Sequence, residues 1–322
     1  MPQSKWINWF CILKNVKARF TDKLFSAGNS TLVLINLLGT LTFSAAEPSG
    51  GHLVIIGGGS RPANVTQRFI ELAGGGAAAH LIVISLASED VDTTAQHAVE
   101  EFKGLGVSHV EALPSAPEEA VRALGQATGV YLSGGDQQRL VDEMARIKAL
   151  GALLEVWRRG GVIAGTSAGA AVMSARMITG EERGLATEDE RFRSIQAGRI
   201  ATTNGFGFLT NAIVDQHFIT RKRSNRLFSA VLEQPQLLGI GIDESTAVIV
   251  GPDQRCEVLG NRTVMLIDAR HAGQVHTNGD ARLAATDLRV HLLVTGDRFD
   301  LNSGRPIPNN ELEKKITPHF KK

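Results

Sequence analysis

The sequence has little of what metal clusters, disulfide frameworks and nucleic-acid surfaces need. Its only two cysteines, Cys11 and Cys256, lie far apart and form no CxxC pair, which excludes a thiolate zinc cluster and a disulfide framework. The formal net charge is only +1, so no extended basic surface for nucleic acid is expected. With 43% hydrophobic residues and no repeat or low-complexity tract, the 322 residues predict a globular protein with a sizeable core.

Residues 1–46 have the pattern of a secretory signal. Several lysines and one arginine precede the apolar run Thr31–Phe43, which is shorter than the roughly 20 residues of a membrane-spanning helix. Ser44-Ala45-Ala46 supplies the small residues that signal peptidase requires, so cleavage is predicted after Ala46. We therefore expect a secreted protein, extracellular or periplasmic, without stable membrane association after cleavage. A retained membrane anchor is the alternative.

Residues 47–322 are predicted to form one α/β domain. In the first half, buried strands alternate with amphipathic helices, which predicts a predominantly parallel sheet sandwiched by helices. A single helix is expected over Gln137–Arg158, and the run Ala170–Met177 favours another. The C-terminal strands, beginning with Leu238–Ile242, are interpreted as antiparallel strands that extend the same sheet. The polar segment 179–193 is predicted to be a loop that could serve as a flap.

The strongest chemical signal is Gly165-Thr166-Ser167-Ala168-Gly169. This GxSxG directly follows an apolar strand and directly precedes a helix-forming run, which is the context of a nucleophile elbow. Small residues flank Ser167 because larger side chains would collide in so sharp a turn, and the strain leaves Oγ above the sheet. The N–H of Ala168 is expected to stabilise an oxyanion. The alternative is a glycine-rich turn with an idle serine.

His217 is the candidate general base for Ser167. It follows a short strand, as Ser167 does, and loops at the carboxyl ends of strands in one sheet can meet. A strand-end histidine taken alone is more often structural, but its combination with an elbow serine favours catalysis. The strand Leu238–Ile242 ends in Asp243 and Glu244, either of which is able to orient the imidazole.

Two glycine turns have different predicted roles. Ser133–Gln137 follows a strand and opens a helix, and the N–H of Gly135 is the candidate for a second oxyanion donor. Gly57–Gly59 resembles the start of a dinucleotide fingerprint, but Pro62 occupies the position of its last glycine. We interpret the Gly57–Gly59 segment as a tight turn between a strand and a helix.

The body of the chain has one dense basic cluster, at 221–226. Considered alone, it is typical of a solvated helix start. Next to a hydrolytic serine, however, the forked geometry of guanidinium favours binding of substrate carboxylates.

Four motifs occur in the order SGGDQ, GTSAGA, DQHF followed by RxRxxR, and GIDEST. With them the sequence resembles the cyanophycinases of secreted type, serine exopeptidases of the peptidase E-like family S51, from about Gly51 to Pro308. The resemblance implies a class I glutamine-amidotransferase-like (flavodoxin-like) α/β fold. It also implies a homodimer that requires neither metal nor cofactor.

The resemblance also assigns residues. It implies Ser167 as nucleophile, His217 as base and Glu244 as the acid, with Asp243 as the fallback. The substrate contacts that it implies are Gln137, Asp215, Gln216, Arg221, Arg223 and Arg226.

The implied substrate is cyanophycin, a polyaspartate that carries arginine on each β-carboxyl, and the implied product is the β-Asp-Arg dipeptide. We expect the arginines of the 221–226 cluster to bind carboxylates, and Asp215 or acids within 181–190 to bind guanidinium. The alternatives are a peptidase E-like dipeptidase for short aspartyl peptides, an α/β-hydrolase esterase, and a binding protein on an inactive scaffold. An esterase would place its acid before its histidine in the chain.

Overall fold

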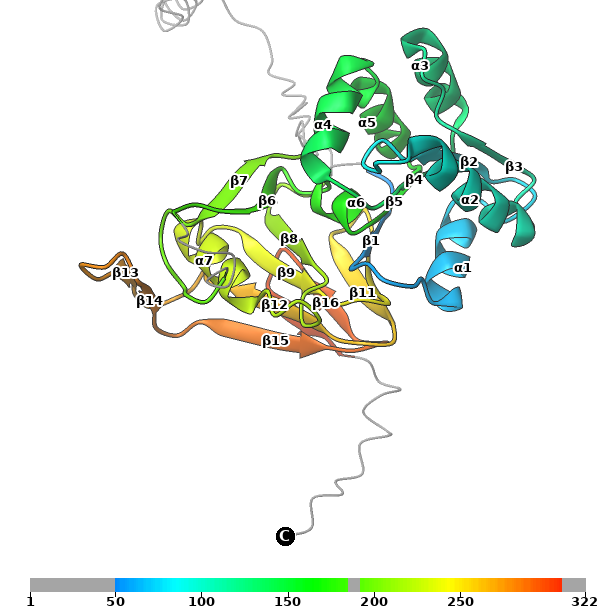
Figure 1. Cartoon of the computed structure of the whole chain (residues 1–322). Helices are drawn as coiled ribbons and strands as arrows, with labels where there is room; N and C mark the ends of the chain where they lie inside the picture. Colours follow the sequence, from blue (N-terminus) through cyan, green and yellow to red (C-terminus); the bar gives the residue numbers. More distant parts are fainter. Residues whose placement is uncertain (1–49, 185–191, 309–322) are drawn as a thin grey trace, which may run out of the picture. The chain divides into compact units, whose positions relative to one another are not determined.

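The computed structural model describes residues 50–184 and 192–308 (Figure 1). The predicted signal segment, 1–46, lies outside these residues. In the first half, strands and helices alternate in the order β1 (Leu53–Ile56), α1 (Ala63–Leu72), β2 (His80–Ile84), α2 (Val91–Gly104), β3 (His109–Ala112), α3 (Pro117–Gln126), β4 (Gly129–Leu132), α4 (Gln137–Arg146), α5 (Leu150–Arg158) and β5 (Val162–Thr166).

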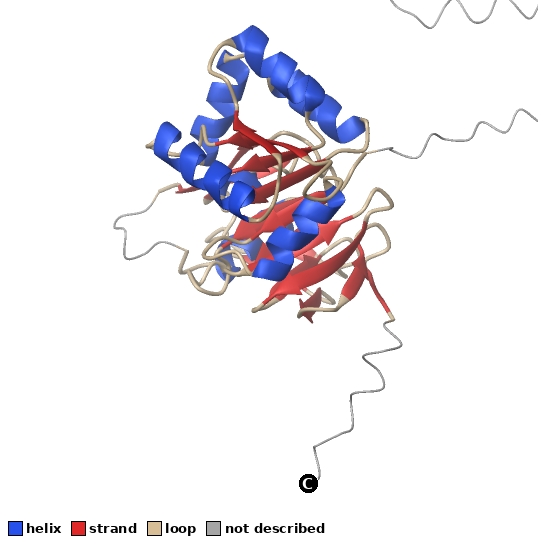
Figure 2. Ribbon diagram, turned by 90° about the vertical axis from the view of Figure 1, so that its right-hand side faces the viewer, coloured by secondary structure: helices blue, strands red, loops and turns tan. Residues whose placement is uncertain are grey.

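These strands form the parallel half of a nine-stranded sheet, in the spatial order β1-β5-β4-β2-β3. Successive residues of β1 alternate between two cores. Leu53 and Ile55 pack into the core shared with α3, α4 and α5, whereas Val54 and Ile56 face the core shared with α1 and α2. Helices accordingly cover both faces of the strands (Figure 2). The predicted α/β sandwich is confirmed.

The rest of the described chain is dominated by strands. Its elements are α6 (Ala168–Ala171), β6 (Arg176–Glu182), β7 (Ile200–Asn204), β8 (Ala212–Gln216), α7 (Ser224–Glu233), β9 (Leu238–Ile242), β10 (Thr246–Val250), β11 (Arg255–Gly260), β12 (Val264–Asp268), β13 (Val275–Thr277), β14 (Leu283–Ala285), β15 (Arg289–Leu293), β16 (Arg298–Asp300) and β17 (Arg305–Ile307).

These C-terminal strands divide between two larger sheets. As predicted, β10 and β11 extend the main sheet with antiparallel pairing next to β1, and β16 and β17, which were not predicted, continue it. The prediction for Leu238–Ile242 is wrong, because β9 lies in a second sheet of order β15-β12-β9-β8 and runs parallel to β8. The strands expected near 264–267 and 290–294, β12 and β15, also belong to this second sheet and not to the main one. Ile240 and Ile242 of β9 face the same core as α3, α4 and α5, while α7 packs on the other face through Leu227 and Val231. An apolar run does not specify which sheet it joins.

The predicted helix over Gln137–Arg158 is interrupted, and α4 and α5 are separate helices. Lys148 adopts φ 53°, the left-handed conformation that ends a helix. The N–H of Ala149 donates to the carbonyl of Met144 (3.2 Å) and that of Lys148 donates to Ala145 (3.1 Å). This is a Schellman motif, which glycine usually marks, and no glycine stands at this position.

The run Ala170–Met177 does not form the predicted helix either. Helix α6 ends at Ala171, and the chain then turns into strand β6. The N–H of Ala175 donates to the carbonyl of Leu209 (2.7 Å), so pairing with a distant segment replaces the next helical turn. Strand β6, paired with β7, also occupies the start of the polar segment 179–193 that was predicted to be a loop.

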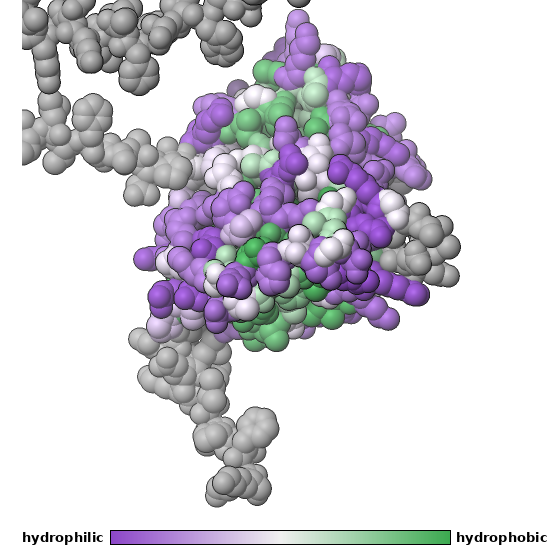
Figure 3. Space-filling model, turned by 90° about the vertical axis from the view of Figure 1, so that its left-hand side faces the viewer, coloured by the Kyte–Doolittle hydropathy of each residue, from purple (hydrophilic) through white to green (hydrophobic). Residues whose placement is uncertain are grey.

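One face of the molecule is mainly hydrophilic, with a hydrophobic area near its lower end (Figure 3). Strand β15 forms an edge of the second sheet, and its Val290 and Leu292 are 45% and 63% exposed.

Among the described residues, no helix combines the length and the apolar character needed to cross a membrane.

The interruption between α4 and α5 gives a stability test. Lys148→Gly removes the strain of a positive φ, so the free energy of unfolding should stay unchanged or rise by up to about 1 kcal/mol. The matched change Lys103→Gly, on the last turn of α2, should lower it by about 1 kcal/mol because φ is helical there. Denaturant unfolding of both variants measures the difference, and equal losses of stability would contradict the assignment.

Candidate active site

Ser167 occupies a strained turn between β5 and α6. Its backbone adopts φ 53° and ψ −111°, a conformation that persists only where surrounding structure imposes it. A Cβ on Gly165 would lie 2.3 Å from the carbonyl oxygen of Gly169, and one on Gly169 would lie 2.4 Å from that of Leu132. The glycines on both sides of Ser167 are therefore required by close backbone contacts.

Three side chains form a continuous chain of hydrogen bonds. Ser167 Oγ lies 2.9 Å from His217 Nε2, and His217 Nδ1 lies 2.6 Å from Glu244 Oε1. Ser167 follows β5, His217 follows β8 and Glu244 closely follows β9, so the carboxyl ends of strands from both larger sheets meet here. The side chains of His217 and Glu244 are only 9% and 23% exposed. In this arrangement the imidazole is able to accept the Ser167 proton while the carboxylate orients it.

Asp243, the fallback acid, has a different position. Its Oδ1 accepts the N–H of Thr220 at 2.9 Å, and Arg262 Nη1 lies 3.4 Å from Oδ2. Burial acts to raise the pKa of Asp243, but hydrogen bonds from Thr220, the Glu244 N–H and Arg262 outweigh it and hold the pKa below its usual value. Asp243 thus ties down the loop after His217, and Glu244 is the acid in contact with the imidazole.

The electrostatic surroundings favour a neutral His217. Burial of the ring is the largest influence and lowers its pKa; the hydrogen bond with Glu244 acts in the opposite direction. The positive charges of Arg221 and Arg223 lower the pKa further, so that the net pKa is below the usual 6.5. An imidazole that is neutral at neutral pH can accept a proton, as a general base must.

The Gly57–Gly59 segment has a role that was not predicted from the sequence. A Cβ on Gly58 would lie 2.3 Å from Cε1 of His217, and one on Gly59 would lie 3.0 Å from Cβ of Glu244. The end of β1 also accepts hydrogen bonds from three loops: Ile56 from the Ser167 N–H (3.1 Å), Gly57 from the His217 N–H (2.7 Å) and Gly58 from the Ser245 N–H (2.8 Å). The signal that could have revealed this role was the run of three consecutive glycines directly after the first strand.

Two backbone segments next to Ser167 carry the candidate oxyanion donors. Ala168 is the first residue of α6, so its N–H has no partner within that helix. In the turn before α4, a Cβ on Gly134 would lie 3.4 Å from Cβ of Ser167. Gly135 lines the same cavity as Ser167, and larger residues are excluded there because its φ is 138° and an added Cβ would lie 2.0 Å from the Ala87 oxygen. Ala168 and Gly135 are thus in place to be tested as oxyanion donors.

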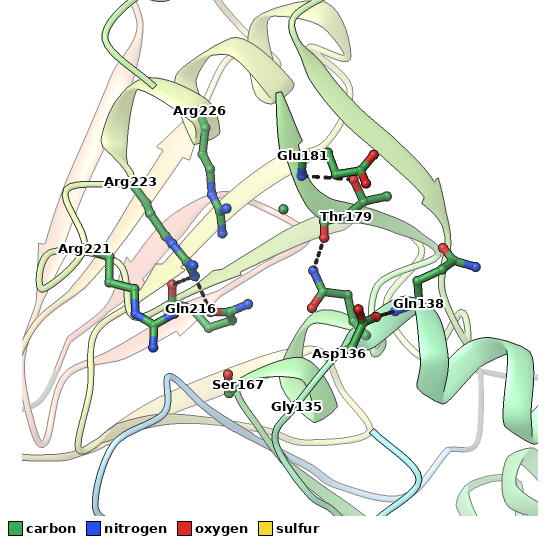
Figure 4. A pocket seen from close by; sticks show the side chains of 12 residues that line it. Gly135, Asp136, Gln138, Ser167, Thr179, Glu181, Gln216, Arg221, Arg223 and Arg226 are labelled. Atoms are coloured by element: carbon green, nitrogen blue, oxygen red, sulfur yellow. Dashed lines mark hydrogen bonds between the residues drawn. The ribbon is translucent and has the colours of Figure 1, made fainter. Parts of the chain in front are cut away.

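Ser167 lies at the base of a cavity of about 430 Å³ (Figure 4). Arg221, Arg223 and Arg226 enter from one side, and Thr179 and Glu181 of β6 lie on the opposite side. The lining residues are Gly135, Asp136, Gln137, Gln138, Ser167, Thr179, Gly180, Glu181, Gln216, Arg221, Arg223 and Arg226.

Asp215 and Arg226 bind each other. Arg226 Nε donates to Asp215 Oδ2 at 2.7 Å, Nη2 donates to Oδ1, and both residues are at most 2% exposed. The guanidinium also stacks 5.0 Å from the centre of the Phe192 ring. Asp215 does not line the cavity, and its carboxylate is occupied, so the expectation that it meets a substrate guanidinium is not what the structure shows. Removing one member of such a buried pair typically costs about 3–5 kcal/mol.

Gln137 lines the cavity but also has a structural contact. Its Nε2 donates to the carbonyls of Ile178 (3.1 Å) and Thr179 (2.5 Å), which fixes β6 against the start of α4.

Gln216 and Arg223 are likewise joined, while Arg221 is exposed at the cavity. Arg223 Nη1 donates to the backbone oxygen of Gln216 at 2.7 Å and to its Oε1. Burial and the charge of Arg226 lower the pKa of Arg223 to about 10, which still leaves it charged at neutral pH. The cavity therefore carries net positive charge on this wall.

Cys256 does not line this cavity. It is buried in β11, and burial raises the pKa of its thiol to about 12. In the described part of the chain, no group of three or more His, Cys, Asp or Glu side chains could hold a metal ion.

The α/β fold and the hydrogen-bonded Ser–His–Glu arrangement define the class of this protein, that of serine hydrolases. A model of Peptidase family S51 matches residues 53–257, and the chain belongs to this family. It is 35% identical over 244 residues to the cyanophycinase of Trichormus variabilis (73% of this chain, 79% of the relative). It is 33% identical over 268 residues to the cyanophycinase of Synechococcus elongatus (79% and 80%).

A solved structure supports the fold. The crystal structure of a peptidase from an acI-B1 Actinobacterium aligns with a TM-score of 0.55 at 22% identity, covering 79% of this chain and 98% of that one. The family and its relatives make this protein a peptidase.

The lowered pKa of His217 can be measured directly. NMR titration of the imidazole should give a midpoint below pH 6.5, because burial and two arginines disfavour the protonated ring. Arg221→Met removes one of these positive charges and should move the midpoint upward, whereas Arg255→Met, on β11, should not. A midpoint above 6.5 in the wild type, or equal shifts in both variants, would contradict the electrostatic account.

Proposed function

We propose that this chain is a serine exopeptidase that hydrolyses cyanophycin to β-Asp-Arg dipeptides through an acyl-enzyme. The observation that carries the proposal is the chain of hydrogen bonds from Ser167 through His217 to Glu244, at 2.9 and 2.6 Å, at the base of an arginine-lined cavity. The relatives of 33–35% identity, which are named cyanophycinases, support the same substrate for this chain.

The chemistry of cyanophycin suits this cavity. Each aspartate of its backbone carries an arginine through the β-carboxyl, so every unit has a free carboxylate and a guanidinium. Arg221 and Arg223 supply positive charge for the carboxylate. The main contribution of Arg226 to this wall is to hold Asp215 in place. The Asp215 carboxylate offsets part of the positive charge of the arginines.

In the proposed first step, Ser167 Oγ attacks the carbonyl carbon of a backbone peptide bond while His217 Nε2 takes its proton. The N–H groups of Ala168 and Gly135 donate hydrogen bonds to the oxyanion that forms. Glu244 stabilises the imidazolium through Nδ1 and keeps the ring oriented toward the serine.

The tetrahedral intermediate then collapses, which completes formation of the acyl-enzyme. The carbon–nitrogen bond breaks, and His217 gives its proton to the departing amine. A water molecule, deprotonated by the same imidazole, then attacks the carbonyl carbon of the ester. The bond from this carbon to Ser167 Oγ breaks, the imidazolium returns its proton to Oγ, and the acid product leaves.

We also propose that the protein acts outside the cytoplasm as a single peptidase domain, 47–322, released by signal cleavage. The supporting observation is the basic, apolar and small-residue pattern of 1–46. The homodimer implied by the resemblance stays a prediction.

Incubation of the purified protein with insoluble cyanophycin tests the function. Clearing of the suspension should release β-Asp-Arg, identified by mass, and Ser167→Ala should lower the rate by about 10⁴-fold or more because the nucleophile is lost. Release of arginine alone, or cleavage of short Asp-X dipeptides without polymer clearing, would contradict the proposal; the latter would favour the peptidase E-like alternative.

The acid is tested with a matched pair of variants. Glu244→Gln should lower kcat by about 10³–10⁴-fold, because an amide cannot stabilise the imidazolium as a carboxylate does. Asp243→Asn keeps an oxygen for the Thr220 N–H and should cost far less. The reverse order of effects would assign the acid role to Asp243.

A further inference from the structure

The geometry points to Glu181 as the residue that recognises the guanidinium of the substrate arginine. This inference rests on the proposed function and deepens it by naming a specificity-determining residue. The inference assigns the carboxylate and the guanidinium of each substrate unit to opposite walls of the cavity.

Among residues 50–184 and 192–308, the other acids near the cavity are already engaged; Glu188, Asp189 and Glu190 of the predicted 181–190 set lie outside the described residues. Glu244 Oε1 is bound to His217, and Asp215 is paired with Arg226 in the interior. Asp136 Oδ1 caps α4 by accepting the N–H groups of Gln138 (2.7 Å) and Arg139 (2.9 Å). Because these contacts are structural or catalytic, the three acids are poorly suited to bind an additional cation.

Glu181 differs from these three acids. It lines the cavity and is exposed, and within 50–184 and 192–308 its carboxylate has no hydrogen bond or ion pair. It lies on β6, across the cavity from Arg221 and Arg223 (Figure 4). A unit that places its carboxylate on the arginine side would thus extend its guanidinium toward the side of Glu181, with Ser167 between the two walls.

Contacts of neighbouring residues fix the backbone at Glu181. The Gln137 amide holds the carbonyls of Ile178 and Thr179, and Gly180 adopts φ 97°, where an added Cβ would lie 3.4 Å from Gln137 Nε2. The N–H of Glu181 donates to Thr179 Oγ1 at 3.3 Å. These contacts hold the backbone at Glu181 in place while the side chain remains free to adjust to a ligand.

The neighbouring Glu182 provides a matched control. Its Oε2 accepts the N–H of Phe192, and it does not line the cavity. Glu182→Gln removes the same charge from the same strand, and the amide oxygen can still accept that hydrogen bond.

The test compares two soluble trimers, one of β-Asp-Arg units and one of β-Asp-citrulline units. Citrulline has nearly the shape of arginine without its charge. Wild type and Glu182→Gln should prefer the arginine trimer by about tenfold in kcat/KM, the effect of one charge-assisted contact. Glu181→Gln should reduce this preference to near unity, chiefly by raising KM for the arginine trimer.

The outcomes separate the inference from the function on which it rests. If wild type cleaves neither trimer nor the polymer, the proposed function fails. If wild type cleaves the trimers but Glu181→Gln keeps the preference for arginine, or loses activity equally on both trimers, the role of Glu181 is overturned. An equal loss would indicate a structural role for the side chain.

Discussion

The backbone at the end of β1 is the constraint on which the site depends. The carbonyls of Ile56, Gly57 and Gly58 accept hydrogen bonds from the N–H groups of Ser167, His217 and Ser245, so one short segment sets the mutual position of the three loops that carry the reactive side chains. Because β1 lies between β5 and β10 in the main sheet, this segment is also anchored on both sides. The distances from serine to imidazole to carboxylate follow from this arrangement.

The same constraint explains why Gly57–Gly59 has no side chains. Cβ atoms there would meet the Asp243 carbonyl, the His217 ring and Glu244. The site also gathers positive charge next to its base, and this is possible because Arg226 is paired with Asp215 in the interior. Burial, together with the positive charges of Arg221 and Arg223, lowers the pKa of His217, and the proposed function uses the same two arginines to bind substrate carboxylates. The same group of charged residues therefore stabilises the fold, through Asp215 and Arg226, and lowers the pKa of His217, through Arg221 and Arg223.

Much of this arrangement could be predicted from local sequence, because Ser167 and His217 each follow an apolar strand. The expectation that both strands belong to one sheet is wrong, since β5 lies in the main sheet and β8 in the second sheet. The choice between Asp243 and Glu244 could not be made in this way. The two residues are adjacent, and only the course of the backbone decides which of them faces the imidazole. The partnership of Asp215 with Arg226 likewise depends on α7 packing against the second sheet, which no local pattern specifies. The second sheet was missed for the same reason, because tertiary contacts determine which sheet a strand joins. The Schellman turn at Lys148 was missed because no glycine marks the end of the helix there.

The central claim is that Ser167 is the nucleophile, activated by its hydrogen bond to His217, which in turn is hydrogen-bonded to Glu244. Its most direct test is to quench the protein with acid during turnover of cyanophycin and to map covalent adducts by peptide mass spectrometry. The account predicts an ester of the carbonyl-side fragment of cyanophycin on the peptide that contains Ser167, and none when His217 is replaced by asparagine. Substrate hydrolysis without any adduct, or an adduct on another residue, would contradict it.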